Sequence, residues 1–198
     1  VLFDEKLALD LGANILGSVN EVFINADGYK KSITSPGLGN YISMAKATAA
    51  TRNVIGEDRL KHRTYIQAHG TGTPQNRATE SHILSKVAKS FQIHNWPIAA
   101  VKSYVGHSVS TSAGDQMAAA LGVFHHGTIP GILTINGTIA DDVSQDRLDF
   151  LTEHRSMGSG NIDATIINSK GFGGNNASAS ILSPNITREM LEKRYGKD

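Results

Sequence analysis

Three clusters of residues that could do chemistry each follow a short apolar run of the sequence. They are His69–Pro74 (HGTGTP), Val101–His107 (VKSYVGH) and Asn168–Asn176 (NSKGFGGNN). Histidine and lysine side chains can move protons or stabilise developing negative charge, and glycines let the backbone approach a ligand closely. Each cluster alone is a weak signal, because a single histidine after a strand is more often structural, and a glycine-rich loop is more often a turn.

The glycines of these clusters do not predict a dinucleotide site. Neither Gly70-x-Gly72 nor Gly171-x-Gly173 opens a strand–helix–strand unit with an acidic residue about 20 residues further on. His125 and His126 end a predicted helix, where a cation complements the helix dipole. No carboxylate or further histidine stands nearby at useful spacing, so we expect no metal site.

The clusters must be held by an alternation of strands and helices. Residues 7–19 could be either a helix or a strand. The β-rich runs predict strands at 19–24, 64–68, 97–101, 164–168 and 177–182. Helices are predicted at 40–54, 77–91 and 112–124, the second of which shows clear apolar periodicity, and a polar helix is predicted at 188–194. This alternation predicts an α/β layer with a mixed or parallel sheet, in which sites lie at strand ends.

Two of the helices carry further information. In helix 77–91, Glu80 lies on the apolar stripe that includes Leu84, and a carboxylate buried there requires a partner elsewhere in the sequence. In helix 112–124, apolar residues cover nearly the whole circumference from Met117 onward, which is typical of the interior of a larger body.

Composition narrows the class of protein. The 198 residues are 39% hydrophobic and 19% charged, with a formal net charge of +1 and no basic run. These values predict one soluble domain with neither a nucleic acid nor a membrane as partner. No signal peptide is visible at the N-terminus, so we expect a cytoplasmic protein. The absence of an initiator Met suggests that the chain begins inside a longer product.

The chain contains no cysteine. This excludes disulfides, thiolate metal sites and a cysteine nucleophile within the chain itself.

Together the three clusters resemble the C-terminal half of the β-ketoacyl synthases, which are condensing enzymes of the thiolase superfamily. The clusters occur in the order that is typical of this family: HGTGTP, then VKSxxGH, then NSxGFGGxN. The resemblance extends over about 7–182. It implies a thiolase-like half with a layered α/β/α architecture and a mixed sheet. The whole of 1–198 would be the synthase C-terminal domain, with 183–198 as a C-terminal extension.

The resemblance implies decarboxylative Claisen condensation of a malonyl thioester with an acyl thioester, in fatty-acid or polyketide synthesis. His69 and His107 would stabilise the enolate oxygen that develops on loss of carbon dioxide. Lys102 and Glu80 would form a supporting pair, in which Lys102 is the partner that the buried Glu80 carboxylate requires. Phe172 would act as a gate, and its backbone N–H would contribute to an oxyanion hole.

The resemblance also implies how substrate is held. Thr71 and Thr73 would bind the phosphopantetheine arm of an acyl carrier protein, and Gly171, Gly173 and Gly174 would let the third loop move. The protein would need no cofactor of its own. Arg77 and Lys170 depart from the usual family residues, an aspartate and an aromatic, and leave the subfamily and the acyl substrate open.

Members of the family are about twice as long and carry the nucleophilic cysteine in their N-terminal half. The expected partners are therefore that half, in the same parent chain or as a separate subunit, and the carrier protein, with a dimer expected by resemblance alone. A non-catalytic subunit that shapes the acyl tunnel or docks the carrier is the alternative. A non-decarboxylating thiolase is less favoured, because such proteins do not normally combine HGTGTP with VKSxxGH.

Overall fold

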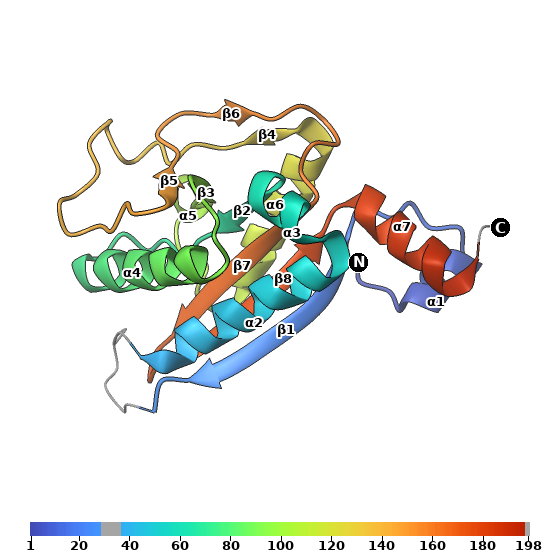
Figure 1. Cartoon of the computed structure of the whole chain (residues 1–198), viewed down its shortest axis with the longest axis horizontal. Helices are drawn as coiled ribbons and strands as arrows, with labels where there is room; N and C mark the ends of the chain where they lie inside the picture. The colour runs from blue at the N-terminus through green and yellow to red at the C-terminus, as the bar shows by residue number, and fades with distance from the viewer. Residues whose placement is uncertain (29–36, 197–198) are drawn as a thin grey trace.

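The computed structural model describes residues 1–28 and 37–196, and its centre is a six-stranded mixed sheet (Figure 1). The strand order is β1-β8-β7-β2-β3-β5. β1, β8 and β7 pair antiparallel, whereas β7, β2, β3 and β5 pair parallel. The mixed α/β sheet that the sequence predicts is confirmed.

The strands of the main sheet follow the apolar runs of the sequence. Their bounds are β1 Ser18–Ala26, β2 Thr64–Gln67, β3 Trp96–Ala99, β5 Leu148–Phe150, β7 Ala164–Gly171 and β8 Asn175–Leu182. β2 and β3 are buried along their whole length, as expected for strands covered on both faces. A separate antiparallel pair is formed by β4 Thr128–Ile129 and β6 Arg155–Ser156.

The described residues form seven α-helices, four of which cover the two faces of the sheet. They are α1 Glu5–Asp10, α2 Leu38–Ile55, α3 Glu57–His62, α4 Pro74–Ser90, α5 Lys102–Val105, α6 Ser112–His126 and α7 Pro184–Tyr195. One apolar core joins α2, α3 and α4 to the sheet, and a second core joins α6 to the opposite face. The expected α/β/α layering is therefore present.

Some elements differ from the sequence predictions. The ambiguous stretch 7–19 divides into the end of α1, an irregular segment and the start of β1. α3 was not predicted, because Gly56, with φ of 83°, ends α2 and starts α3 without an intervening loop. β5 and β6 have only three and two residues, too few to show periodicity.

α6 is covered on one side only. Its buried side chains include Gln116, Ala120 and Phe124, whereas Ala113 and Ala118 are exposed. The neighbouring part of the sheet is uncovered on the same face. There, Val22 and Ile24 of β1, paired with Ala179 and Ala177 of β8, are 55% and 75% exposed.

The two ends of the described chain meet at one end of the sheet. α1 and α7 lie side by side there, away from the layered body (Figure 1). Arg194 forms an ion pair with Glu5, and the Tyr195 hydroxyl donates to Glu5 Oε1 at 2.7 Å. α7 lies within the predicted extension 183–198, of which residues 197 and 198 are outside the described part. None of the described helices is long and apolar enough to cross a membrane.

Candidate active site

His69 lies two residues beyond the C-terminal end of β2, and its position is fixed by backbone geometry. It is followed by Gly70, whose φ is 59°. A Cβ added at Gly70 would lie 2.7 Å from the Ala100 Cβ, so a side chain there would clash as well as strain the backbone. His69 itself is buried and lines a large cavity.

Glu80, on α4, holds the loop that carries His69. Its Oε1 accepts hydrogen bonds from the backbone N–H of His69 at 2.7 Å and from Asn168 Nδ2 at 2.8 Å. Its Oε2 accepts from the Gly70 N–H and from Asn76 Nδ2, both at 2.9 Å. The carboxylate therefore joins α4, the end of β2 and β7 through four donors.

The expected direct ion pair between Glu80 and Lys102 is wrong. Within the part of the chain that the structure describes, Lys102 Nζ is buried without a hydrogen-bond partner. Burial lowers the pKa of Lys102, and the charges of Glu80 and Asp115 oppose that shift. The buried carboxylate is satisfied by amide donors, which form shorter and better directed contacts than the flexible lysine, so Lys102 acts on Glu80 through its field at longer range.

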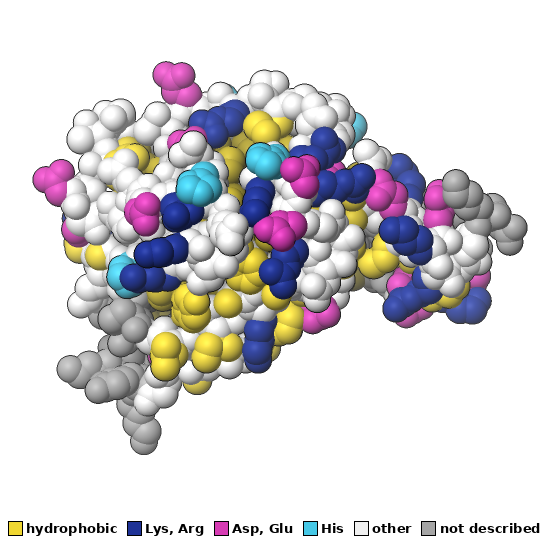
Figure 2. Space-filling view, in the orientation of Figure 1, with side chains coloured by type: hydrophobic (Ala, Val, Ile, Leu, Met, Phe, Trp, Pro, Cys, Tyr) yellow, Lys and Arg dark blue, Asp and Glu magenta, His cyan; other side chains and the backbone are white. Residues whose placement is uncertain are grey.

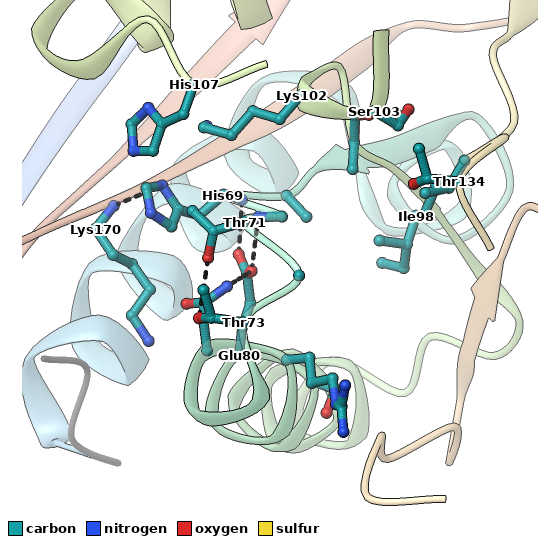
Figure 3. A pocket seen from close by; sticks show the side chains of 18 of the residues that line it. His69, Thr71, Thr73, Glu80, Ile98, Lys102, Ser103, His107, Thr134 and Lys170 are labelled. Atoms are coloured by element: carbon teal, nitrogen blue, oxygen red, sulfur yellow. Dashed lines mark hydrogen bonds between the residues drawn. The ribbon is translucent and has the colours of Figure 1, made fainter. Parts of the chain in front are cut away.

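His107 follows α5 and faces His69. The two imidazole rings lie edge to face, with centroids 5.4 Å apart and planes at 84° (Figure 3). Val109 is in the left-handed region, with φ of 57°, which is unusual for a β-branched residue and strains the backbone. This strained conformation brings the Val109 N–H to 3.1 Å from His107 Nδ1.

The hydrogen bonds of the two imidazoles assign their tautomers. His69 Nδ1 accepts from the Lys170 N–H at 3.3 Å, and His107 Nδ1 accepts from Val109. An accepting Nδ1 carries no proton, so in the neutral ring the proton is on Nε2. The site thus holds two neutral imidazoles, each with one N–H free to donate to a ligand.

Electrostatics keeps His69 neutral. Burial lowers its pKa to about 4, with the charges of Lys102, His107 and Lys170 acting in the same direction and that of Glu80 opposing them. The pKa of His107 is also lowered, by desolvation and by Lys102. Both rings therefore remain neutral donors at neutral pH.

The third cluster forms the turn between β7 and β8. Phe172 is 81% exposed at its tip and lines the cavity together with Gly171. Gly173 and Gly174 have φ of 79° and 76°, which suits glycine, but they do not line this cavity. Their expected role in substrate binding stays a prediction, as does the gating role of Phe172.

One cavity, of about 1110 Å³, brings together most of the predicted site residues (Figure 3). Its lining includes His69, His107, Lys102, Glu80, Thr71, Thr73, Gly171 and Phe172. The hydroxyl oxygens of Thr71 and Thr73 lie 3.5 Å apart at its wall. The described residues contain no group of three or more side chains suited to hold a metal ion. The arrangement can stabilise an anion that develops between two imidazole N–H groups.

Comparison with known proteins decides the family. The profile of the family described as "Beta-ketoacyl synthase, C-terminal domain" matches residues 16–136.

The chain belongs to the β-ketoacyl synthase C-terminal domain family.

Known relatives extend this assignment over the whole chain. The chain is 52% identical over 198 residues to β-ketoacyl-[acyl-carrier-protein] synthase FabY of Pseudomonas aeruginosa, covering all of this chain and 31% of that relative. The crystal structure of that noncanonical ketosynthase superposes with a TM-score of 0.91 over 97% of this chain and 30% of its own. The 3-oxoacyl-[acyl-carrier-protein] synthase 2 of Synechocystis sp. is 30% identical over 89% of this chain and 40% of its own length. The chain thus spans about a third of the length of these synthases.

Sequence reasoning missed Gln116, which supports the candidate site from the α6 side of the sheet. It is fully buried on α6, and its Nε2 donates to the carbonyl oxygens of Gln67, Ala68 and Asn168 at 3.0, 2.8 and 3.1 Å. Its Oε1 accepts from Ser169 Oγ at 3.1 Å. One amide therefore links the end of β2 to β7. The available signal was a polar residue directly before the apolar run that begins at Met117.

Proposed function

We propose that the chain supplies the two-histidine half of a synthase that condenses a malonyl thioester with an acyl thioester. The observation that carries this proposal is the pair His69 and His107, two neutral Nε2–H donors whose Nδ1 atoms are held by backbone N–H groups. Both side chains line the same cavity. Family membership and the similarity to FabY support the assignment.

The chemistry requires donors of this kind. In the malonyl thioester, the bond between the α-carbon and the carboxylate breaks, carbon dioxide leaves, and the electron pair forms an enolate whose charge lies on the thioester oxygen. His69 and His107 donate hydrogen bonds to that oxygen. The enolate carbon then attacks the acyl carbonyl held on a cysteine, a new C–C bond forms, and the cysteine thiolate leaves.

Lys102 and Glu80 have supporting roles in this proposal. The Lys102 charge lowers the pKa of both histidines and so favours the neutral donors. Glu80 fixes the backbone of His69 through two N–H groups. Phe172 and the flexible turn around it would cover the reacting atoms, with its N–H in the oxyanion hole.

The nucleophilic cysteine must come from outside this chain, and an exposed apolar surface supports a contact with the part that carries it. The second face of α6 and the neighbouring Val22 and Ile24 are uncovered, although they are apolar. An apolar surface of this kind marks an interface. We propose that the N-terminal half of the synthase covers it, in the same parent chain or as a separate subunit, with the whole of 1–198 as the C-terminal domain.

Substrate delivery is proposed from the two threonines that follow His69 in the wall of the cavity (Figure 3). Thr71 and Thr73 present hydroxyls suited to the amides of a phosphopantetheine arm, so the thioester would be delivered by an acyl carrier protein, and the synthase would need no cofactor of its own. A dimer and a cytoplasmic location belong to the same proposal.

The test is carbon dioxide release by the full-length parent protein. With malonyl carrier protein labelled in its free carboxyl group and an acyl thioester, we expect labelled carbon dioxide and a β-ketoacyl product identified by mass spectrometry. A non-catalytic subunit would give neither when combined with carrier protein and thioesters. That result, from folded parent protein, would overturn the catalytic assignment.

The pH dependence provides an independent expectation. Because the pKa of His69 is about 4 and that of His107 is also lowered, protonation of the two donors begins below the ordinary histidine value of about 6.5. The decarboxylation rate should therefore stay constant as the pH falls through 6.5 and decline only at lower pH. Lys170→Met removes a charge that lowers the His69 pKa, so that pKa, measured by NMR titration of the imidazole, should rise. Lys86→Met, at an exposed position of α4, should leave it in place.

A further inference from the structure

The wall of the active-site cavity carries more positive charge than its own acidic side chains balance. Beside the two neutral histidines, the charged residues among the described lining are Arg77, Glu80, Lys102 and Lys170. Arg77 already has a partner, because its Nε lies 2.8 Å from Oδ1 of Asp142. The Nζ atoms of Lys102 and Lys170 are both buried and have no hydrogen-bond partner among the described residues. The cavity therefore has two ammonium groups to which no described side chain is bonded.

Lys170 is the lysine that is bonded to His69. It lies on β7, is 7% exposed, and its backbone N–H donates to His69 Nδ1 at 3.3 Å (Figure 3). The residue expected here from the family resemblance is aromatic, so the charge beside the histidine is a departure of this chain. A buried cation is costly unless it is paired, which indicates that Lys170 meets an anion when the site is occupied.

Two carboxylates act on Lys170 from a distance, but neither is bonded to it. Burial lowers the pKa of Lys170, and the charges of Glu80 and Asp27 oppose that shift. Both oxygens of Glu80 already accept from four N–H donors. Asp27 Oδ1 accepts from the Asn40 N–H at 3.2 Å and from Asn176 Nδ2 at 2.9 Å. Asp27 Oδ2 has no partner among the described residues, but Asp27 does not line the cavity, whereas Lys170 does.

We propose that Lys170 binds the free carboxylate of the malonyl thioester and so distinguishes this substrate from the uncharged acyl thioester. The inference rests on the proposed function. One methylene group separates that carboxylate from the thioester carbonyl, whose oxygen accepts from His69, so a cation that binds it must lie next to His69. The lysine side chain is a flexible stem with three N–H donors, which can turn toward a ligand in the cavity. Hydrogen bonds between an ammonium group and a carboxylate are about twice as strong as those between neutral groups.

The role of Lys170 in this proposal is binding. When the bond between the α-carbon and the carboxylate breaks, carbon dioxide leaves without charge, and the negative charge moves to the thioester oxygen at the two histidines. Lys170 therefore stabilises the bound substrate more than the transition state. An interaction of that kind lowers KM without raising kcat.

Two pantetheine thioesters that cannot lose carbon dioxide test this assignment. Sulfoacetyl-pantetheine has a sulfonate in place of the malonyl carboxylate, and malonamyl-pantetheine has an uncharged amide there. Lys170→Met removes the charge, Lys170→Arg keeps it, and Lys89→Met, at an exposed position of α4, is the control. The measurement is the calorimetric Kd of each thioester for the full-length protein and for each variant.

We expect the unmodified protein and Lys89→Met to bind sulfoacetyl-pantetheine about tenfold or more tightly than malonamyl-pantetheine. Lys170→Met should remove most of that preference while changing malonamyl-pantetheine binding by less than about twofold, and Lys170→Arg should keep most of it. An absent preference in the unmodified protein, or one that survives in Lys170→Met, would overturn the proposal. Equal weakening of both thioesters would do so too, because it would show that Lys170 acts only on the shape of the cavity.

A second comparison separates the carboxylate from the phosphate of the carrier arm. Phosphopantetheine and pantetheine, both without an acyl group, are titrated into the same proteins. If Lys170→Met abolishes a preference for phosphopantetheine and leaves the sulfoacetyl preference intact, the anion that Lys170 binds is the phosphate and the proposal is wrong. If Lys170→Met does not fold, as judged by its thermal transition, Lys170→Gln replaces it.

Kinetics with malonyl carrier protein provides the last measurement. Lys170→Met should raise KM by about tenfold and change kcat by less than about threefold. A lower kcat at unchanged KM would contradict the binding role. A protein that binds the anionic thioester through Lys170 but forms no β-ketoacyl product contradicts the proposed function and leaves the anion site standing.

Discussion

Replacing His69 with alanine in the full-length protein should lower the rate of malonyl decarboxylation by about 10²–10³-fold, the usual cost of losing one preorganised donor to a developing oxyanion. The reason is geometric. The His69 ring is fixed by the Lys170 N–H at Nδ1 and by the Glu80 contact at its backbone, so its Nε2–H needs no reorganisation when charge develops. His107→Ala should have an effect of similar size, since its ring is held in the same way by Val109.

Release of labelled carbon dioxide in single-turnover experiments measures this effect directly. Because the two donors act on one oxygen, the double variant should lose much less than the product of the two single effects. His82→Ala, at an exposed position of α4, is the control and should keep the full rate. A His69→Ala protein that folds normally and releases carbon dioxide at the unmodified rate would show that the imidazole does not contact the reacting oxygen.

The fold was largely accessible from sequence because its strands and long helices carry strong local patterns. The runs that become β2 and β7 contain β-branched and aromatic residues, and α4 shows a clear apolar stripe. The elements that escaped prediction depend on long-range pairing. β5 is three residues long and exists because its backbone pairs with β3, and nothing within those residues shows this.

Sequence motifs predicted which residues gather around the cavity but not the contacts that they make, and the catalytic roles of these residues stay predictions. Motif order located His69, His107 and Lys102, and the structure places all three around one cavity. The partner of Glu80 was not predictable, because charge complementarity suggested a lysine whereas tertiary folding supplied four amide donors. The hydrogen bonds of Gln116 and the ion pair between Arg77 and Asp142 likewise join residues far apart in the sequence.

Glu80 gives the second large expected effect, and it is one of stability as well as activity. In Glu80→Gln, one carboxylate oxygen becomes an NH₂ group that faces two N–H donors. Whichever oxygen is replaced, two buried donors lose their acceptor, either those of His69 and Asn168 or those of Gly70 and Asn76. Each buried donor left unsatisfied costs about 1–3 kcal/mol, so the free energy of unfolding should fall by about 2–6 kcal/mol.

Denaturant unfolding of the full-length protein measures that loss, with Glu153→Gln, an exposed glutamate after β5, as the control that should leave the midpoint unchanged. The folded fraction of Glu80→Gln should also lose decarboxylation activity, since the His69 and Gly70 N–H groups no longer share a rigid anchor. If a direct charge interaction with Lys102 were the main role of Glu80, Lys102→Met would destabilise the protein as much as Glu80→Gln does. The structure predicts a smaller effect or a gain, because Lys102→Met removes a buried charge that has no hydrogen-bond partner among the described residues, whereas Glu80→Gln breaks contacts that are already made.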